Sequence, residues 1–134
     1  MTDSIAFQTK IDLPYEQAVD QVIAALKAEG FGVLTRIDVK ATLKEKLDLD
    51  FRPYVILGAC NPPLAHRALE ADSTVGGMLP CNVTVEQDGN GALVSIANPE
   101  IMLSAGQLAS DNQLKQVASE ARARLERVQS NLAV

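Results

Sequence analysis

The chain has 134 residues, of which 12 are Lys or Arg and 17 are Asp or Glu, so its net charge is −5 at pH 7. This acidic balance disfavours binding to nucleic acid or to anionic membranes, because their phosphates would be repelled. An apolar content of 47% and a charged content of 22% over this length are typical of one globular domain, residues 1–134.

The N-terminal third of the chain alternates between strand-like and helix-like patterns. Apolar side chains at every second position predict strands over residues 5–13 and 31–39, the second with Val33 and Ile37 on one face. The segment between these strands carries an apolar stripe at helical spacing. It ends at Gly30, a residue that can close a helix in a left-handed conformation.

The central stretch carries the strongest local signals. A short helix is predicted over residues 41–47, and the continuous apolar run at residues 54–57 predicts a strand that is covered on both faces. Gly58 and Ala59 follow this strand, and Cys60 comes next. Asn61 is then suited to cap a short helix that includes residues 64–71, and Pro62 or Pro63 fits the first helical position.

The C-terminal part of the chain predicts a hairpin and a long helix. Residues 81–87 alternate as a strand, residues 88–91 have the Asp-Gly-Asn-Gly composition of a hairpin turn, and residues 92–97 form the returning strand. A short helix through Leu103 follows. From about Asp111, apolar residues recur every three and four positions, which predicts a long amphipathic helix.

This order of elements predicts an α+β fold. We expect a single sheet of about five strands, mostly antiparallel, with the helices mainly on one face, because helices and strands are mixed without a regular βαβ alternation. A sheet that is covered on one side leaves its other face exposed. We therefore expect a homodimer, the common way of covering such a face.

The two cysteine segments give the sequence a family resemblance. The motifs ILGACNPPLA and LPCNV, with PYEQAVDQVIAALKAEGFGVLTRIDVKATLKEKL before them and NPEIML after them, resemble the bacterial and archaeal family known as domain of unknown function 302. The similarity runs over roughly residues 7–128. It implies a fold similar to that of the TATA-binding protein, and it brings no assigned activity.

Cys60 and Cys81 are the candidates for thiol chemistry. Cys60 would lie at a helix N-terminus, whose partial positive charge favours a thiolate only modestly, by about 0.3–1 kcal/mol. In a redox protein Cys60 would react first, and Cys81 would resolve the product by forming a disulfide with Cys60. This requires that their Cα atoms approach within about 7 Å. The alternative is that both are packed as small apolar residues, as free cysteines often are.

A ligand pocket is the second kind of site that the sequence supports. The amides after Cys60 and the backbone of the Gly76-Gly77 pair could bind an anion or a small molecule, with Tyr54 as a further polar contributor. The alternative for the glycine pair is a flexible turn. The candidate binding residues lie in two neighbouring segments: Gly58, Cys60, Asn61, Leu64, Gly76, Gly77, Cys81 and Asn82.

Other classes of site find little support in the sequence. Cys60, Cys81 and the single histidine, His66, supply at most three soft ligands at spacings unlike those of zinc sites, so no metal is expected. No nucleotide motif is present, and we expect no cofactor. The cations of the last helix are interleaved with Glu120 and Glu126, and aromatic residues are few, so we expect no nucleic-acid partner.

These observations favour a binding module over an enzyme. We expect a small-molecule or anion pocket near Cys60 and Cys81, with a thiol-dependent redox or sulfur-handling protein as the alternative. The N-terminus lacks the features of a secretory signal, and no apolar run approaches the roughly 20 residues of a membrane span. We therefore expect a cytoplasmic protein without a membrane partner.

Overall fold

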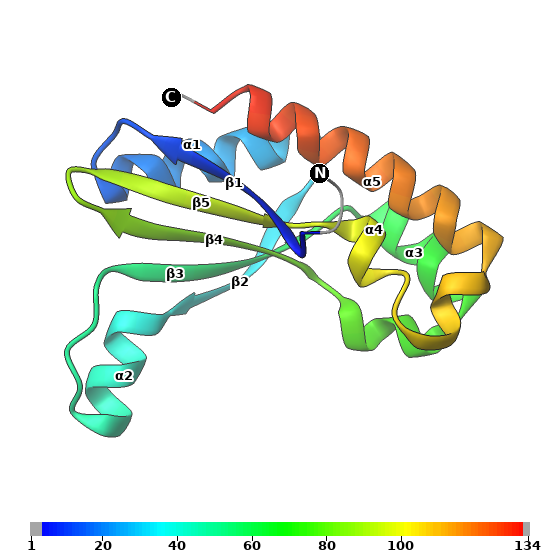
Figure 1. Ribbon diagram of the computed structural model, residues 1–134, viewed down its shortest axis with the longest axis horizontal. Coiled ribbons are helices and arrows are strands. Elements are labelled where there is room, and N and C mark those ends of the chain that lie inside the picture. The colour runs from blue at the N-terminus through cyan, green and yellow to red at the C-terminus, as the bar shows by residue number, and fades with distance from the viewer. Residues whose placement is uncertain (1–3, 133–134) are drawn as a thin grey trace.

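Five antiparallel strands form one sheet in the order β1-β5-β4-β3-β2, in a computed structural model that describes residues 4–132 (Figure 1). The strands are β1 (Ala6–Ile11), β2 (Gly32–Asp38), β3 (Tyr54–Cys60), β4 (Cys81–Asp88) and β5 (Gly91–Ala97). The α-helices are α1 (Tyr15–Ala28), α2 (Val39–Leu47), α3 (Pro62–Ala71), α4 (Pro99–Met102) and α5 (Asn112–Ser130). Two 3-10 helices, η1 (Ser73–Met78) and η2 (Gly106–Ser110), join them.

Helices α1 and α5 cover one face of the sheet (Figure 1). Alternate residues of the inner strands point toward them: Val55 and Leu57 of β3 lie opposite Val85 and Val83 of β4, and all four are buried. The other face carries no such helix, and we call it the open face. The predicted α+β fold, a single antiparallel sheet with its helices mainly on one side, is confirmed.

The turn after α1 fixes how the chain enters β2. Gly30 has φ +86°, its N–H donates to the carbonyl of Lys27 at 3.0 Å, and the N–H of Phe31 donates to the carbonyl of Leu26 at 2.9 Å. This pair of bonds is the Schellman motif, which favours glycine at the left-handed position. Leu26 and Phe31 are both buried, so the turn delivers Phe31 to the core.

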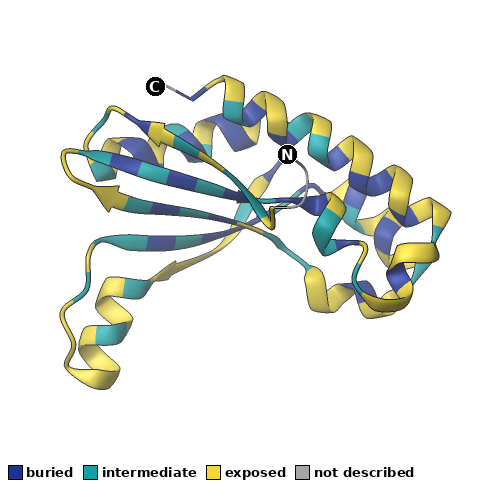
Figure 2. Ribbon diagram, viewed as in Figure 1, coloured by how far each residue is buried: buried dark blue, intermediate teal, exposed yellow. Residues whose placement is uncertain are grey.

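A second apolar cluster lies beyond one end of the sheet. There α3 and α4 pack against the first half of α5, and Leu64, Val75, Leu114 and Val117 are buried among them (Figure 2). Asn98 and Asp111 start α4 and α5 by accepting backbone N–H groups at 3.0 Å each. This helical end forms a wall next to the start of β4.

The prediction that Val33 and Ile37 share a face is wrong, because β2 contains an irregularity between Val33 and Thr35. Val33 lies opposite Ala59 on the helix-covered face, whereas Ile37 lies opposite Ile56 on the open face. An extra residue in a strand, here Leu34, shifts all later side chains to the other face. As a result Leu34 and Ile37 are 68% and 48% exposed.

Helix α2 projects from the body of the protein (Figure 1). It starts at Val39, earlier than predicted, because the Asp38 side chain accepts the N–H of Ala41 at 2.9 Å and so caps the helix. None of its residues is buried. Among the described residues, no helix has the length and apolar character needed to cross a membrane.

Candidate functional site

The end of β3 and the start of β4 lie side by side. Ala59 pairs with Cys81 and Gly58 with Asn82 in the antiparallel register, and α3 begins two residues after Cys60. Most of the residues predicted to form a site therefore meet at one corner of the sheet. The corner has two sides with different properties, one packed and one open.

The packed side lies between the sheet and helices α3 and α5. It contains an apolar cavity of only about 30 Å³, hardly more than one water molecule needs. Its lining comes from the strand ends and the surrounding helices: Phe31, Ala59, Cys60, Asn61, Leu64, Ala65, Ala68, Leu79, Pro80, Cys81, Pro99, Leu103, Val117 and Ala121. No ligand of ordinary size fits here without rearrangement.

The start of α3 does not offer the free amides that an anion would need. Pro62 and Pro63 have no N–H, and the N–H of Leu64 is bound to the Asn61 side-chain oxygen at 3.2 Å. Asn61 itself is 8% exposed, and its amide nitrogen lies 3.5 Å from the Glu29 carbonyl. Asn61 therefore joins the ends of α1 and α3, and residues 62–64 at this helix start offer no free N–H to an anion.

Both cysteines are free thiols, and each is partly buried. Burial, and secondarily the neighbouring Cys60, raise the pKa of Cys81 to about 11. The thiolate is the nucleophile in thiol chemistry, so Cys81 is held in its unreactive form at neutral pH.

We expect Cys81 to be alkylated slowly in the native protein. In a Cys60→Ser variant, where Cys81 is the only thiol, iodoacetamide should react at pH 8 at least tenfold more slowly than it does with the same variant in urea. The native rate should rise at higher pH than that of the unfolded chain, which titrates near 9, because burial, the larger cause of the raised pKa, remains when Cys60 is replaced. Mass spectrometry of timed samples measures both rates. Equal rates in the two states would show that Cys81 is accessible and unshifted.

The open side of the corner leads into a groove of about 590 Å³ on the open face. We call it the open-face groove. Its floor is the sheet, and the residues around η1 and α4 form the wall at one end. The lining residues are Ser4, Ile5, Ala6, Gln8, Tyr54, Gly77, Met78, Leu79, Pro80, Cys81, Asn82, Thr84, Glu86, Ser95, Ala97 and Met102. Of the predicted binding residues, Gly77, Cys81 and Asn82 line it, whereas Gly76 does not.

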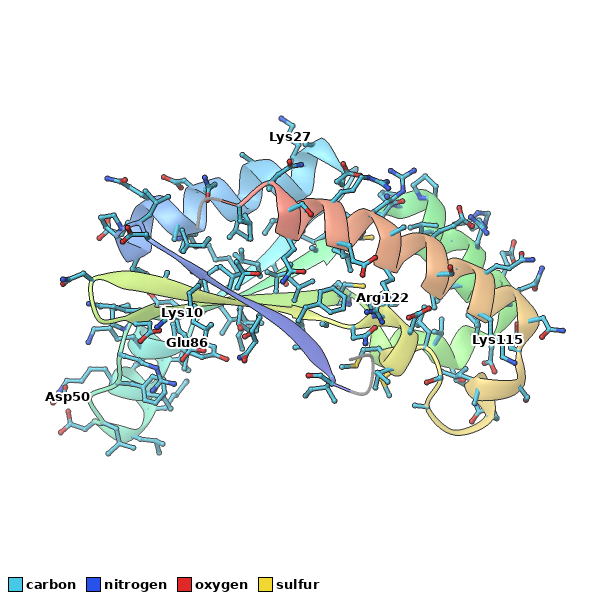
Figure 3. The ribbon with its side chains drawn as sticks, turned by 45° about the horizontal axis from the view of Figure 1, so that its top comes forward. Lys10, Lys27, Asp50, Glu86, Lys115 and Arg122 are labelled. Carbon is cyan, nitrogen blue, oxygen red and sulfur yellow. The ribbon has the colours of Figure 1, made fainter. Side chains whose placement is uncertain are left out.

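The polar side chains of the groove fall into two groups. Some are already bonded: Gln8 donates to the Ser95 hydroxyl at 3.1 Å, and Arg52 donates to one oxygen of Glu86 at 2.8 and 2.9 Å. Glu86 lies on the side of the sheet away from α1 and α5 (Figure 3). The side chains of Asn82 and Thr84, in contrast, make no hydrogen bond to any described residue. They are free to bind a ligand.

On the strands that form the groove, sequence reasoning missed four polar residues, namely Gln8, Thr84, Glu86 and Ser95. Each alternates along its strand with residues that face the helices, so the period-two pattern already assigned them to the opposite face. The missing information was the strand order. It places β1 next to β5 and thereby brings Gln8 to Ser95, although 87 positions separate them in the chain.

The remaining candidate ligands stay apart. His66 is exposed, with its Nε2 3.4 Å from a Glu70 oxygen one turn later. Within the part of the chain that the structure describes, no three His, Cys, Asp or Glu side chains are grouped so that they could hold a metal ion.

Comparisons with known proteins agree with this fold. The profile of the family described as "domain of unknown function DUF302" matches residues 7–132. An uncharacterized conserved DUF302 protein from Bacillus stearothermophilus has a similar crystal structure, with 30% sequence identity and a TM-score of 0.85. The similarity covers 96% of this chain and 98% of that one. The comparison with curated proteins finds no match.

Proposed function

This chain belongs to the DUF302 family, whose description assigns no activity, and on that scaffold we propose that the open-face groove binds a small neutral polar molecule. The observation that carries the proposal is the pair of unbonded polar side chains, Asn82 and Thr84, on the floor of a groove of about 590 Å³. That volume lies in the range of small-molecule sites, about 300–1,000 Å³.

The lining supports a ligand that both donates and accepts hydrogen bonds. An amide and a hydroxyl group each do both, so Asn82 and Thr84 suit hydroxyl or amide groups of a ligand. Among the described residues, no lysine or arginine lines the groove, and the one lining carboxylate, Glu86, is paired with Arg52. These residues offer a charged ligand no free counter-charge. Met78 and Met102 supply an adaptable apolar end.

The test is a titration of the labelled protein with defined probes. Neutral sugars, polyols and primary amides at millimolar concentration should shift the backbone amide NMR signals of Asn82, Thr84 and Ser95, while sodium phosphate should not. Thr84→Val and Asn82→Ala should each weaken binding of the best probe by about 2- to 12-fold, the effect expected for the loss of one hydrogen bond. Asn90→Ala, in the exposed hairpin turn, is the matched control and should leave binding unchanged.

Two results would contradict the proposal. The first is a set of shifts that follows phosphate instead of the neutral probes, which would indicate an anion site. The second is probe binding that is equally strong in the wild type and in the Asn82→Ala, Thr84→Val double variant, which would place the site elsewhere.

Thiol chemistry at Cys60 and Cys81 is less well supported. The register brings the two residues to the same corner, which favours it. Burial of Cys81, which keeps its thiol neutral, disfavours it. The same alkylation assay on a Cys81→Ser variant, in which Cys60 is the only thiol, tests this alternative, because a redox pair needs a thiol that ionises near neutral pH.

A further inference from the structure

The exposed apolar side chains of the protein gather in one segment. Among the described residues, four of the seven large hydrophobic side chains that are exposed belong to β2, α2 and the loop after them: Leu34, Ile37, Leu47 and Leu49. Their exposed fractions run from 48% to 68%. Figure 2 shows this segment almost entirely in the colour of exposed residues. None of its residues lines the open-face groove.

The backbone of β2 is also uncovered. β2 is an edge strand that pairs only with β3, and no hydrogen bond from any other described part of the chain reaches its outer edge between Val33 and Ile37. The opposite edge strand, β1, is bonded by a side chain of its own protein, because Gln129 of α5 donates to the Gln8 carbonyl at 3.3 Å. An exposed, apolar edge strand is a template for pairing with another strand.

Helix α2 has little support within its own chain: Lys40 donates to the Phe51 carbonyl at 2.9 Å, and Val39 and Leu43 are only half-buried. It spans nine residues, and isolated helices shorter than about 12–15 residues are marginal in water. Val39, Leu43 and Leu47 recur every four residues and form an apolar stripe, yet no residue of the helix is buried. Contact with another surface would cover this stripe and stabilise the helix.

The charges on β2 fit a second copy of the same strand. Arg36 and Asp38 lie on one face, opposite Leu57 and Val55, with Ile37 between them on the other face. In an antiparallel pair with a two-fold axis at Ile37, Arg36 of each copy lies opposite Asp38 of the other. Arg36 makes no ion pair with any described residue of its own chain, so it is available.

We propose that β2 and α2 form the interface of a symmetrical homodimer, in which β2 pairs with β2 of a second copy around Ile37 and joins the two sheets. Each interface then contains two reciprocal Arg36–Asp38 pairs on one face and an Ile37–Ile37 contact on the other. Because α2 begins two residues after Ile37, the two α2 helices lie next to each other and cover their apolar stripes. A peptide of unrelated sequence would pair with the backbone edge of β2, but its charges would not match this two-fold pattern.

The test is the oligomeric state of the intact chain, measured by sedimentation equilibrium with circular dichroism as the check on folding. The wild type is expected to be a dimer. Ile37→Asp should weaken the dimer about 100-fold, or about tenfold for each copy of the residue. Leu69→Glu, an exposed leucine on α3, is the matched control and should remain dimeric.

A charge exchange separates the interface from a folding defect. Arg36→Asp and Asp38→Arg should each weaken self-association, because like charges then face each other across the axis. Asp38→Arg also removes the cap of α2, so circular dichroism is recorded for both variants. Mixed in equal amounts, the two variants should form a heterodimer that native mass spectrometry resolves by mass.

A monomeric wild type would overturn the proposal in favour of a foreign strand as the partner. A dimer that survives both Ile37→Asp and the single charge reversals would overturn it by placing the interface on another surface.

Discussion

Replacing Phe31 by alanine is expected to lower the free energy of unfolding by about 3–5 kcal/mol, the cost of removing a large buried aromatic side chain. Phe31 is 2% exposed and belongs to the core between the sheet and helices α1 and α5. It also lines the small cavity at the Cys60 corner, together with residues of α3 and α5. Its ring therefore lies where the two apolar clusters meet, and its loss enlarges an existing void.

Thermal and urea denaturation followed by circular dichroism measure this effect. For a chain of this size the expected loss corresponds to a fall in Tm of about 10–20 °C. Phe31→Met, which keeps most of the volume, should cost about 1.5 kcal/mol or less. Phe51→Ala is the matched control, because Phe51 is only partly buried and contacts the Arg52 guanidinium 4.5 Å from its ring centre. A loss at Phe31 no greater than at Phe51 would contradict the assignment.

Gly58→Val is expected to destabilise the protein by about 1–3 kcal/mol, the usual cost of overpacking. A Cβ atom at Gly58 would collide with the Thr35 hydroxyl and would lie 2.9 Å from the Pro80 ring. The glycine is therefore required by close packing between β2, β3 and the segment before β4. Because Pro80 also lines the open-face groove, we expect the substitution to disturb the groove as well.

A double-mutant cycle identifies the cause of this loss. Gly58→Ala alone should be destabilising, and Thr35→Ala should recover at least about 0.5 kcal/mol of that loss when combined with it, since the colliding hydroxyl is then absent. Gly32→Ala is the control, because a Cβ there meets no atom within 4 Å. Its stability should stay within about 0.5 kcal/mol of the wild type. Additive effects at Gly58 and Thr35 would show that the two do not compete for the same space.

The elements of this fold were largely predictable because each carries a local signal. The alternation in β4, the turn composition at residues 88–91 and the stripe of α5 are set by neighbours within a few positions. Gly30 ends α1 in a left-handed conformation and Asn61 caps the start of α3, as the sequence predicted. These features depend on backbone geometry and capping, which short stretches of sequence encode directly.

The features that escaped prediction depend on distant partners. The irregularity at Leu34 reverses the faces of β2, and the pattern within the strand does not locate it, because Val33 and Ile37 fit an unbroken alternation in which Leu34 is a single apolar residue on the polar face. The groove required knowing that β1 lies beside β5. The two prolines of α3 were visible, but their consequence for an anion site was not, because it depended on the Asn61 side chain occupying the one remaining amide.

The division of the sheet into a helix-covered face and an open face has a practical consequence for protein engineering. Gln8, Thr84 and Ser95 contribute little to the buried core, so replacing them should leave stability within about 0.5 kcal/mol of the parent in most cases. A combinatorial library randomised at these positions would therefore retain soluble expression in a large share of its members. Such a scaffold could be selected for new small-molecule receptors without first being stabilised.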